Sequence, residues 1–223
     1  MQATYFIVCG IGSKGSTLLA QKMEGNMESP AVYAIGHLGG QIRDFAGDGS
    51  RWGLDVAYVD EGETLLGTGG AVRGAIDEAD VGDEPNGGFL VLYGDSYLSI
   101  DIAALWAASG DGGHPVMSVL RNDGQWDASN AAYDGAMVTC YEKGRSDGSL
   151  GFIDYGISVL NGGVIREHVA ADTPYDLADV FHRLAEAGQL RGFEATERFY
   201  EIGSPQGLAD LEAFLGGQTL TSA

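Results

Sequence analysis

Short apolar runs alternate along this chain with segments whose apolar residues recur every three or four positions. The runs are typical of buried β-strands, and the longer period is typical of helices that bury one face. The predicted strands are Tyr5–Cys9, Ala31–Ile35, Val56–Val59, Phe89–Tyr93, Val116–Leu120, Met137–Tyr141, Ile153–Leu160 and Leu190–Glu194. The predicted helices are Ser16–Met23, Gly40–Phe45, Gly70–Asp77, Ile102–Ala108, Leu177–Ala187 and Gln206–Leu215.

The helix predicted over Leu177–Ala187 has the clearest buried face, because its large apolar residues follow an i, i+3, i+4, i+7 pattern. These residues are Leu177, Val180, Phe181 and Leu184. Asp101 and Ser204 precede two other predicted helices, and side chains of their kind accept hydrogen bonds from N–H groups of a first helical turn. We therefore expect both to be N-caps.

The order of these elements predicts the fold. Strands and helices alternate through the first half, which is typical of a parallel, doubly wound sheet. The segment Ala131 to Leu160 instead has the pattern of antiparallel strands joined by glycine-containing turns. We therefore expect a three-layer α/β/α fold with one mostly parallel, mixed sheet. Residues 1–223 are expected to form a single domain, with an atypical strand, loop and helix over residues 1–30.

The charge of the chain limits its partners. Acidic residues outnumber basic ones by 32 to 12, which gives a formal net charge of −20. Lysine occurs only at Lys14, Lys22 and Lys143. Because nucleic-acid backbones and anionic membranes are bound through Lys and Arg, neither is an expected partner. An acidic, lysine-poor surface fits a salt-adapted host and an ordinary acidic cytosolic enzyme equally well.

Neither membrane insertion nor secretion is indicated. No apolar stretch approaches membrane-spanning length, and the first apolar run lacks the basic flank of a signal peptide. We therefore expect a cytoplasmic protein. Cys9 and Cys140 lack metal-ligand spacing and lie in apolar runs, so we expect both to be buried as small apolar residues. The four histidines are scattered, without zinc spacing or a nucleophilic partner.

Two segments of the first half carry the candidate chemistry. Leu65–Ala75 is a glycine-rich turn that runs into a helix, and Phe89–Tyr97 is an apolar strand that ends in Gly94 and Asp95. Free N–H groups at a helix N-terminus favour anions, and open α/β sheets bind ligands at the carboxyl ends of their strands. Together the segments suggest a site for a nucleotide and its divalent metal.

Further motifs occur in order along the chain, and any one of them alone is weak. They are Gly36-His37-Leu38, Gly67–Ala71, Gly94-Asp95-Ser96, Trp126–Asn130, Ile153–Ile157 and Arg198–Pro205. In this order they resemble the sugar-phosphate nucleotidyltransferases, and most closely bacterial heptose-1-phosphate guanylyltransferases. The resemblance covers roughly Ala31 to Leu215 and implies a nucleotide-diphospho-sugar transferase-like fold.

The resemblance implies a reaction in which a sugar-1-phosphate and a nucleoside triphosphate give an NDP-sugar and pyrophosphate. Such phosphoryl chemistry depends on positioning and charge neutralisation, with Mg²⁺ held by carboxylates. Asp95 matches the metal-binding aspartate of the family. Glu201 aligns with a second acidic ligand that is Asp in many relatives, and Glu is one methylene longer. The structural alternatives are a turn or capping residue for Asp95 and a solvated strand-end carboxylate for Glu201.

The resemblance also implies residues that contact the substrates. Gly67, Thr68, Gly69 and Gly70 match the turn that approaches base and ribose, where a Cβ would block the backbone; a plain helix-initiating turn is the alternative. Lys143, with Glu142 beside it, resembles the pair that holds sugar hydroxyls and phosphate, although a surface ion pair is equally compatible. The other residues expected on the sugar side are Asn130, Asp154 and Gly156.

The resemblance is weakest at the N-terminus. The family carries a Gly-x-Gly-Thr-Arg-Leu loop and a Pro-Lys-Pro segment there, whereas this chain has Gly10 to Gly15 and no such proline pair. Gly10 and Gly12, with Lys14 in place of the arginine, are the expected triphosphate contacts. The alternatives are a divergent working loop, a replaced N-terminus, and a non-catalytic nucleotide- or sugar-phosphate-binding protein. The base, the sugar and the oligomeric state, a homo-oligomer included, are left open.

Overall fold

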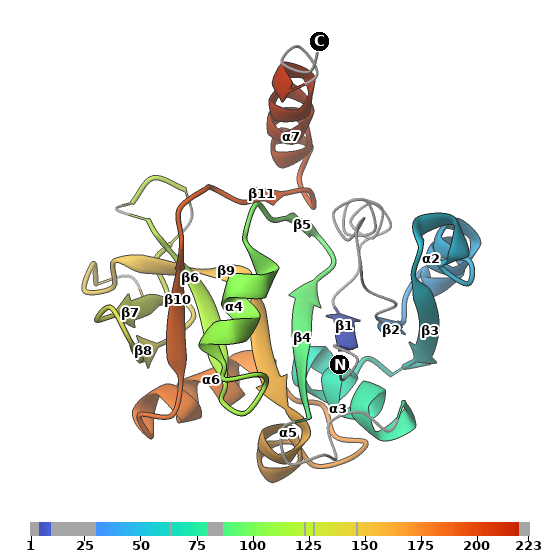
Figure 1. The fold of residues 1–223 in the computed structure, drawn as a ribbon, viewed down its shortest axis with the longest axis horizontal. Helices are drawn as coiled ribbons and strands as arrows, with labels where there is room; N and C mark the ends of the chain where they lie inside the picture. The colour runs from blue at the N-terminus through green and yellow to red at the C-terminus, as the bar shows by residue number, and fades with distance from the viewer. Residues whose placement is uncertain are drawn as a thin grey trace.

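The computed structural model describes residues 5–9, 30–62, 64–79, 87–122, 124–126, 128–145 and 147–218. Within them a nine-stranded sheet is flanked by helices (Figure 1). Its strands are β1 (Tyr5–Cys9), β2 (Pro30–Ile35), β3 (Asp55–Asp60), β4 (Gly88–Tyr93), β6 (Val116–Arg121), β7 (Ala131–Tyr133), β8 (Val138–Tyr141), β9 (Phe152–Asn161) and β10 (Arg191–Ala195). The main path runs β10-β6-β9-β4-β1-β2-β3, and β7 pairs with β8 and β9.

The sheet is mixed, as the sequence predicted. β1 pairs in parallel with β2 and β4, β2 with β3, and β6 with β10. β9 runs antiparallel between β4 and β6, with Ile157 opposite Leu92 and Phe152 opposite Arg121. The first half of β9 therefore lies at the edge where the parallel strands end. This edge collects the residues that the sequence singles out.

Helices cover both faces of the sheet, which confirms the three-layer α/β/α fold. They are α2 (Gly39–Ala46), α3 (Gly67–Glu78), α4 (Ile102–Ala108), α5 (Gly162–His168) and α6 (Leu177–Glu186), with a 3₁₀ turn over Ser50–Trp52. Buried side chains alternate between the faces along β4: Phe89 and Val91 join the core of α3, α5 and α6, whereas Leu90 and Leu92 join that of α4. α2 packs on the same face as α4, against Tyr33 and Ile35 of β2.

The predicted stripe of α6 and both predicted N-caps are confirmed. Leu177, Val180, Phe181 and Leu184 are all buried. The Asp101 side chain accepts a hydrogen bond from Ala104 N–H at 3.0 Å, and Ser204 Oγ accepts one from Gly207 N–H at 3.0 Å. Local capping chemistry thus sets these helix starts.

Other predicted elements differ from the structure. α3 begins at Gly67 rather than Gly70, so the glycine-rich turn is its first turn. α5 was not predicted, because its paired glycines disfavour a helix; the Asn161 side chain caps it by accepting from Val164 N–H at 2.9 Å. The short strand β7 was also missed. The helix predicted over Ser16–Met23 lies outside the described residues.

A two-stranded ribbon and a C-terminal helix complete the described fold. β5 (Ser96–Tyr97) pairs antiparallel with β11 (Tyr200–Glu201), and α7 (Pro205–Gln218) follows β11. Figure 1 shows α7 standing away from the main sheet, beyond the ribbon. It packs on the ribbon through a small core whose buried members are Tyr200, Ile202 and Leu211.

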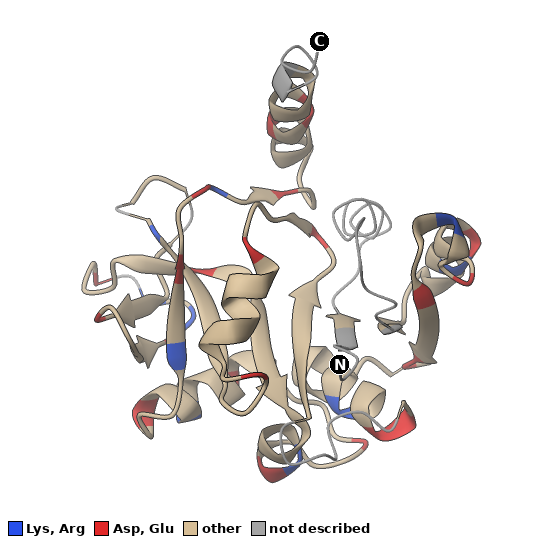
Figure 2. Cartoon of the chain, viewed as in Figure 1, with Lys and Arg blue, Asp and Glu red and all other residues tan. Residues whose placement is uncertain are grey.

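Charged residues occur throughout the described part of the molecule (Figure 2). Figure 2 shows acidic residues spread over the helices and loops rather than gathered in one place. In the part of the chain that the structure describes, no helix is both long and apolar enough for a membrane span. Cys140 is only half-buried, which corrects the expectation of full burial, and its Sγ lies 3.9 Å from Nη1 of Arg145.

Candidate functional site

The β5–β11 ribbon brings together two carboxylates that are far apart in the sequence. Asp95 lies two residues after β4 and immediately before β5, and Glu201 ends β11 opposite Ser96 of β5. Ile202 N–H donates a hydrogen bond of 2.8 Å to the backbone oxygen of Asp95. The ribbon therefore fixes Asp95 and Glu201 as neighbours at the carboxyl edge of the parallel strands.

The surroundings of Asp95 disfavour its negative charge. Burial raises the pKa of Asp95, and the nearby Glu201 charge raises it further. The residue's own backbone N–H and the Ser96 hydroxyl, 3.4 Å from Oδ1, act in the opposite direction but do not cancel the effect. A pair of neighbouring carboxylates with net repulsion is stabilised by a cation placed between them.

The donor set at this point fits Mg²⁺. Mg²⁺ is commonly held by one or two carboxylates, with waters and substrate phosphate oxygens completing its octahedron. Asp95 and Glu201 supply two carboxylates of this kind. No group of three or more His, Cys, Asp or Glu side chains suited to a metal occurs within the described ranges.

The first turn of α3 packs against another part of the chain, the segment that precedes α6. The N–H groups of Gly69 and Gly70 both donate to the carbonyl oxygen of Tyr175, at 2.9 and 3.3 Å. This corrects the expectation that the N–H groups of this turn are free for an anion. Gly67 has φ +71°, and a Cβ there would lie 2.7 Å from the Tyr175 oxygen. Close packing therefore explains glycine here, and contact with a nucleotide stays a prediction.

Thr68 joins the N-termini of α3 and α6. Its hydroxyl donates to Oδ1 of Asp176 at 3.0 Å and accepts from Leu177 N–H at 2.9 Å. Asp176 in turn caps α6 by accepting from Ala178 N–H at 2.9 Å. Sequence reasoning missed Asp176, although an Asp directly before the apolar stripe of α6 is a recognisable N-cap signal.

Lys143 reaches this junction from the turn after β8. Its Nζ lies 3.3 Å from Oδ2 of Asp176, and both side chains are about half exposed. Burial by itself raises the pKa of Asp176. The pKa is nevertheless held below its ordinary value by the Ala178 N–H, the Lys143 charge and the Thr68 hydroxyl. The predicted phosphate-binding lysine and the predicted nucleotide-binding helix thus share one carboxylate.

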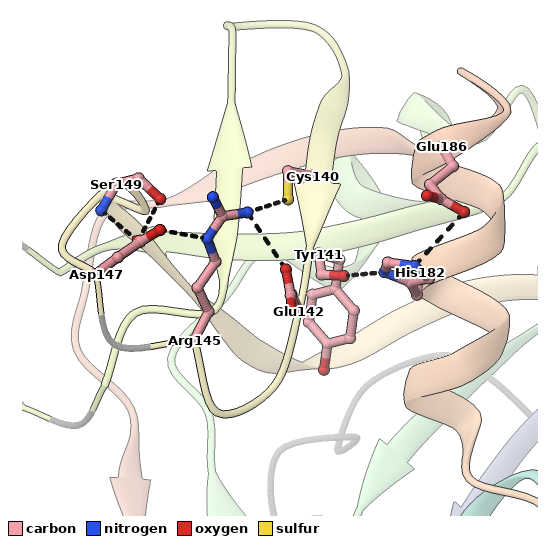
Figure 3. Close-up of polar contacts among 8 residues, drawn as sticks. All are labelled: Cys140, Tyr141, Glu142, Arg145, Asp147, Ser149, His182 and Glu186. Carbon is pink, nitrogen blue, oxygen red and sulfur yellow. Dashed lines mark hydrogen bonds and ion pairs between the residues drawn. The ribbon is translucent and has the colours of Figure 1, made fainter.

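Glu142, the neighbour of Lys143, has a different partner. Arg145 Nη1 lies 3.3 Å from Oε2 of Glu142, and Arg145 Nε lies 2.8 Å from Oδ2 of Asp147. Figure 3 shows Arg145 between these two carboxylates, with Cys140 beside it. These pairs are largely exposed, so the arrangement alone assigns no ligand to Glu142.

Three predicted sugar-side residues lie together at the start of β9. Asn130 Oδ1 accepts from Asp154 N–H at 2.8 Å, and Asp154 Oδ1 accepts from Gly156 N–H at 3.0 Å. The Tyr141 hydroxyl, which sequence reasoning missed, donates to Oδ2 of Asp154 at 3.3 Å. Gly156 has φ +98°, a conformation that L-residues with a side chain rarely adopt.

Asp154 is the most enclosed carboxyl group of the sugar-side cluster. Burial raises its pKa, against the lowering effects of the Gly156 N–H, the Tyr141 hydroxyl and the Lys143 charge. A carboxyl group in this setting readily accepts hydrogen bonds from a ligand's hydroxyl groups.

The predicted triphosphate contacts Gly10, Gly12 and Lys14 lie outside the described residues.

The sheet order, the two layers of helices and the site at the carboxyl edge define a fold of the nucleotide-diphospho-sugar transferase type, as the resemblance implied. No protein-family model matches the chain. A Bacillus anthracis protein described as a glucose-1-phosphate thymidylyltransferase, solved with sucrose, is similar to it at TM-score 0.75 and 14% identity, over 96% of this chain and 95% of the other.

Two further solved structures share the fold at similar levels. HddC from Yersinia pseudotuberculosis, complexed with GMP-PN, has TM-score 0.73 and 19% identity, over 96% of this chain and 100% of that one. The inositol-1-phosphate CTP transferase from T. maritima has TM-score 0.69 and 17% identity, over 99% and 98% of the two chains. At these identities the likeness establishes the fold, and it spans nearly the whole chain.

Proposed function

We propose that this chain is a Mg²⁺-dependent nucleotidyltransferase that condenses a sugar-1-phosphate with a nucleoside triphosphate. The observation that carries the proposal is the pairing of β5 with β11, which makes Asp95 and Glu201 neighbours at the ligand-binding edge of this fold. Support comes from the nucleotidyltransferases among the structures of the same fold.

The proposed reaction is an in-line displacement at the α-phosphorus. An oxygen of the sugar phosphate forms a bond to the α-phosphorus while the bond to the bridging oxygen of the β-phosphate breaks, and pyrophosphate leaves. Asp95 and Glu201 would hold Mg²⁺, which when bound supplies positive charge to phosphate oxygens. The protein's other residues bind and orient the two substrates.

In this proposal the predicted substrate contacts divide between two sides of the site. Lys143 lies in the turn after β8 and would hold the phosphate of the sugar-1-phosphate as a point charge. Asn130, Glu142 and Asp154 would accept hydrogen bonds from sugar hydroxyls, with Gly156 leaving room beside them. The first turn of α3, from Gly67 to Gly70, would lie against the nucleotide, and Lys14 with Gly10 and Gly12 against its triphosphate.

The base and the sugar define the finer proposal. The sequence resemblance to heptose-1-phosphate guanylyltransferases makes GTP with a heptose-1-phosphate the first pair to test. A structure of the same fold, HddC, was solved with GMP-PN, which supports including guanine nucleotides early. Because glycine turns contact bases through the backbone, side chains do not narrow the choice further.

The test is pyrophosphate release with Mg²⁺ across five nucleoside triphosphates and a panel of sugar-1-phosphates, in low and high KCl. We expect release with one preferred pair, lowered roughly 10²-fold or more in Asp95→Asn. Folded protein that binds nucleotide yet releases no pyrophosphate with any pair would contradict the proposal. That result would favour the non-catalytic binding protein that the divergent N-terminus suggests.

A further inference from the structure

The Glu201 side chain is held by the start of α7 as well as by the ribbon. Ser204 Oγ donates a hydrogen bond of 3.0 Å to Oε2 of Glu201, and Ser204 Oγ itself accepts one from Gly207 N–H at 3.0 Å. Because an N–H can only donate and an ionised carboxylate can only accept, the hydroxyl proton is directed at Glu201. Ser204 therefore both caps α7 and holds one oxygen of Glu201.

Two glycines leave the space that this arrangement needs. A Cβ at Gly203 would collide with Oε1 of Glu201, and a Cβ at Gly207 would collide with the Glu201 backbone oxygen and lie 3.1 Å from Oε2. The carboxylate thus lies folded against the segment from Gly203 to Gly207. Its conformation depends on where α7 begins.

α7 is itself fixed to the ribbon by contacts that do not involve Glu201. The Phe214 ring stacks on Tyr200 with centroids 4.7 Å apart, and Leu211 is buried. Arg198 Nη2 lies 3.4 Å from Oδ2 of Asp210. Ser204 therefore approaches Glu201 from a helix whose position is set independently.

We propose that Ser204 is a positioning residue for the second metal ligand, an inference that rests on the metal site of the proposed function. Its hydroxyl donates to Oε2 of Glu201 and so fixes the orientation of the carboxylate that would share the cation with Asp95. A glutamate has one more rotatable bond than an aspartate and loses more side-chain entropy when fixed. Holding one oxygen removes this freedom before the metal arrives, as outer-shell partners of metal ligands commonly do.

The test is the binding of Mn²⁺ alone to the full chain at high KCl. The electron paramagnetic resonance signal of free Mn²⁺ measures how much of the ion is bound. The site is defined as the binding that Asp95→Asn removes. Ser204→Ala is expected to weaken that binding roughly tenfold, and Ser204→Thr to restore it. Ser204→Gly gives a second variant without the donor, and it disturbs the helix start less, because glycine is tolerated at an N-cap better than alanine.

A matched control separates positioning from capping. Asp101→Ala removes the N-cap of α4 and is expected to lower stability while leaving the Mn²⁺ affinity unchanged. Unchanged affinity in both Ser204→Ala and Ser204→Gly would overturn the inference while the metal site stands. Wild-type protein that binds Mn²⁺ no better than Asp95→Asn would overturn the inference and the metal site together.

Discussion

The ionised Asp95 carboxylate that the proposed metal site requires lowers the stability of the protein when no metal is bound. Burial and the neighbouring Glu201 charge both raise its pKa, so the ionised carboxylate destabilises the folded protein at neutral pH. Binding sites commonly keep such groups because the ligand reverses the cost. Replacing Asp95 should therefore raise the stability of the metal-free protein and lower its activity.

We expect Asp95→Asn to lower turnover by roughly 10²-fold or more, and to melt at a higher temperature than wild type in metal-free buffer. Excess MgCl₂ should raise the melting temperature of wild type and leave that of the variant unchanged. Differential scanning fluorimetry with and without MgCl₂ measures both effects. Asp44→Asn, at an exposed position of α2, is the control. A variant with normal turnover would remove Asp95 from the site.

Lys143 permits a sharp comparison because Arg145 lies on the same turn. Both are cations in exposed ion pairs, Lys143 with Asp176 and Arg145 with Glu142 and Asp147. We expect Lys143→Met to raise KM for the sugar-1-phosphate roughly tenfold or more, since it removes a charge-assisted contact. Arg145→Met should change KM little. Equal effects in steady-state kinetics would assign Lys143 a structural role only.

Asp154 predicts a pH dependence of stability. Its pKa is raised by burial, so its contribution to stability is fully present below the unfolded pKa and is lost as pH rises through the folded pKa. Asp154→Asn keeps an acceptor for Gly156 N–H and removes the buried charge. The variant should gain stability relative to wild type at pH 7, and the gain should shrink on acidification. Urea unfolding across this pH range gives the measurement; a gain that grows on acidification would contradict the sign.

At the scale of elements, the hydrogen bonds of Thr68 join the N-termini of α3 and α6, and a substitution there measures how much this junction stabilises the fold. Thr68→Val keeps the shape of the side chain but leaves Leu177 N–H without its acceptor and removes the hydrogen bond to Asp176. We expect a loss of about 1–3 kcal/mol in the free energy of unfolding. Thr139→Val is the control, because that exposed hydroxyl makes one contact at 3.4 Å. Urea denaturation of both variants decides whether the junction stabilises the fold.

Sequence periodicity predicted the elements that bury a continuous face. The continuous apolar run of β4 and the apolar stripe of α6 are both local sequence patterns, so each could be read without knowing its neighbours in the fold. The order of strands and the presence of β9 between β4 and β6 depend on contacts between distant segments. The two-residue strands β5 and β11 were missed for the same reason, because each exists only through the other.

The candidate site was predictable to a similar degree. The resemblance singled out Asp95 and Glu201, which the structure places on adjoining segments. It gave no sign of Asp176 or Tyr141, whose parts come from hydrogen bonds across the fold. For the glycines of α3, the sequence motif has two explanations. The resemblance assigns them to the space beside a ligand, whereas the structure shows that they also pack closely against the Tyr175 backbone.

For the whole molecule, charge is the dominant physical feature. A net charge of −20 on 223 residues produces repulsion that the twelve cations offset only in part. Ion pairs such as Arg43 with Asp60 are largely exposed and add little stability. The free energy of folding should therefore depend on the screening length of the solvent.

We expect the melting temperature to rise by several degrees as KCl increases from about 0.1 M to about 1 M, because the Debye length falls from about 10 Å to about 3 Å. Scanning calorimetry in KCl measures the rise, and sucrose serves as an uncharged control. Screening should saturate once the Debye length is shorter than the spacing of surface carboxylates, whereas exclusion of a solute from the surface keeps increasing with its concentration. A rise that levels off in KCl therefore assigns the effect to charge repulsion. A melting temperature no lower at 0.1 M than at 1 M would show that the acidic surface is an ordinary one, without dependence on salt for stability.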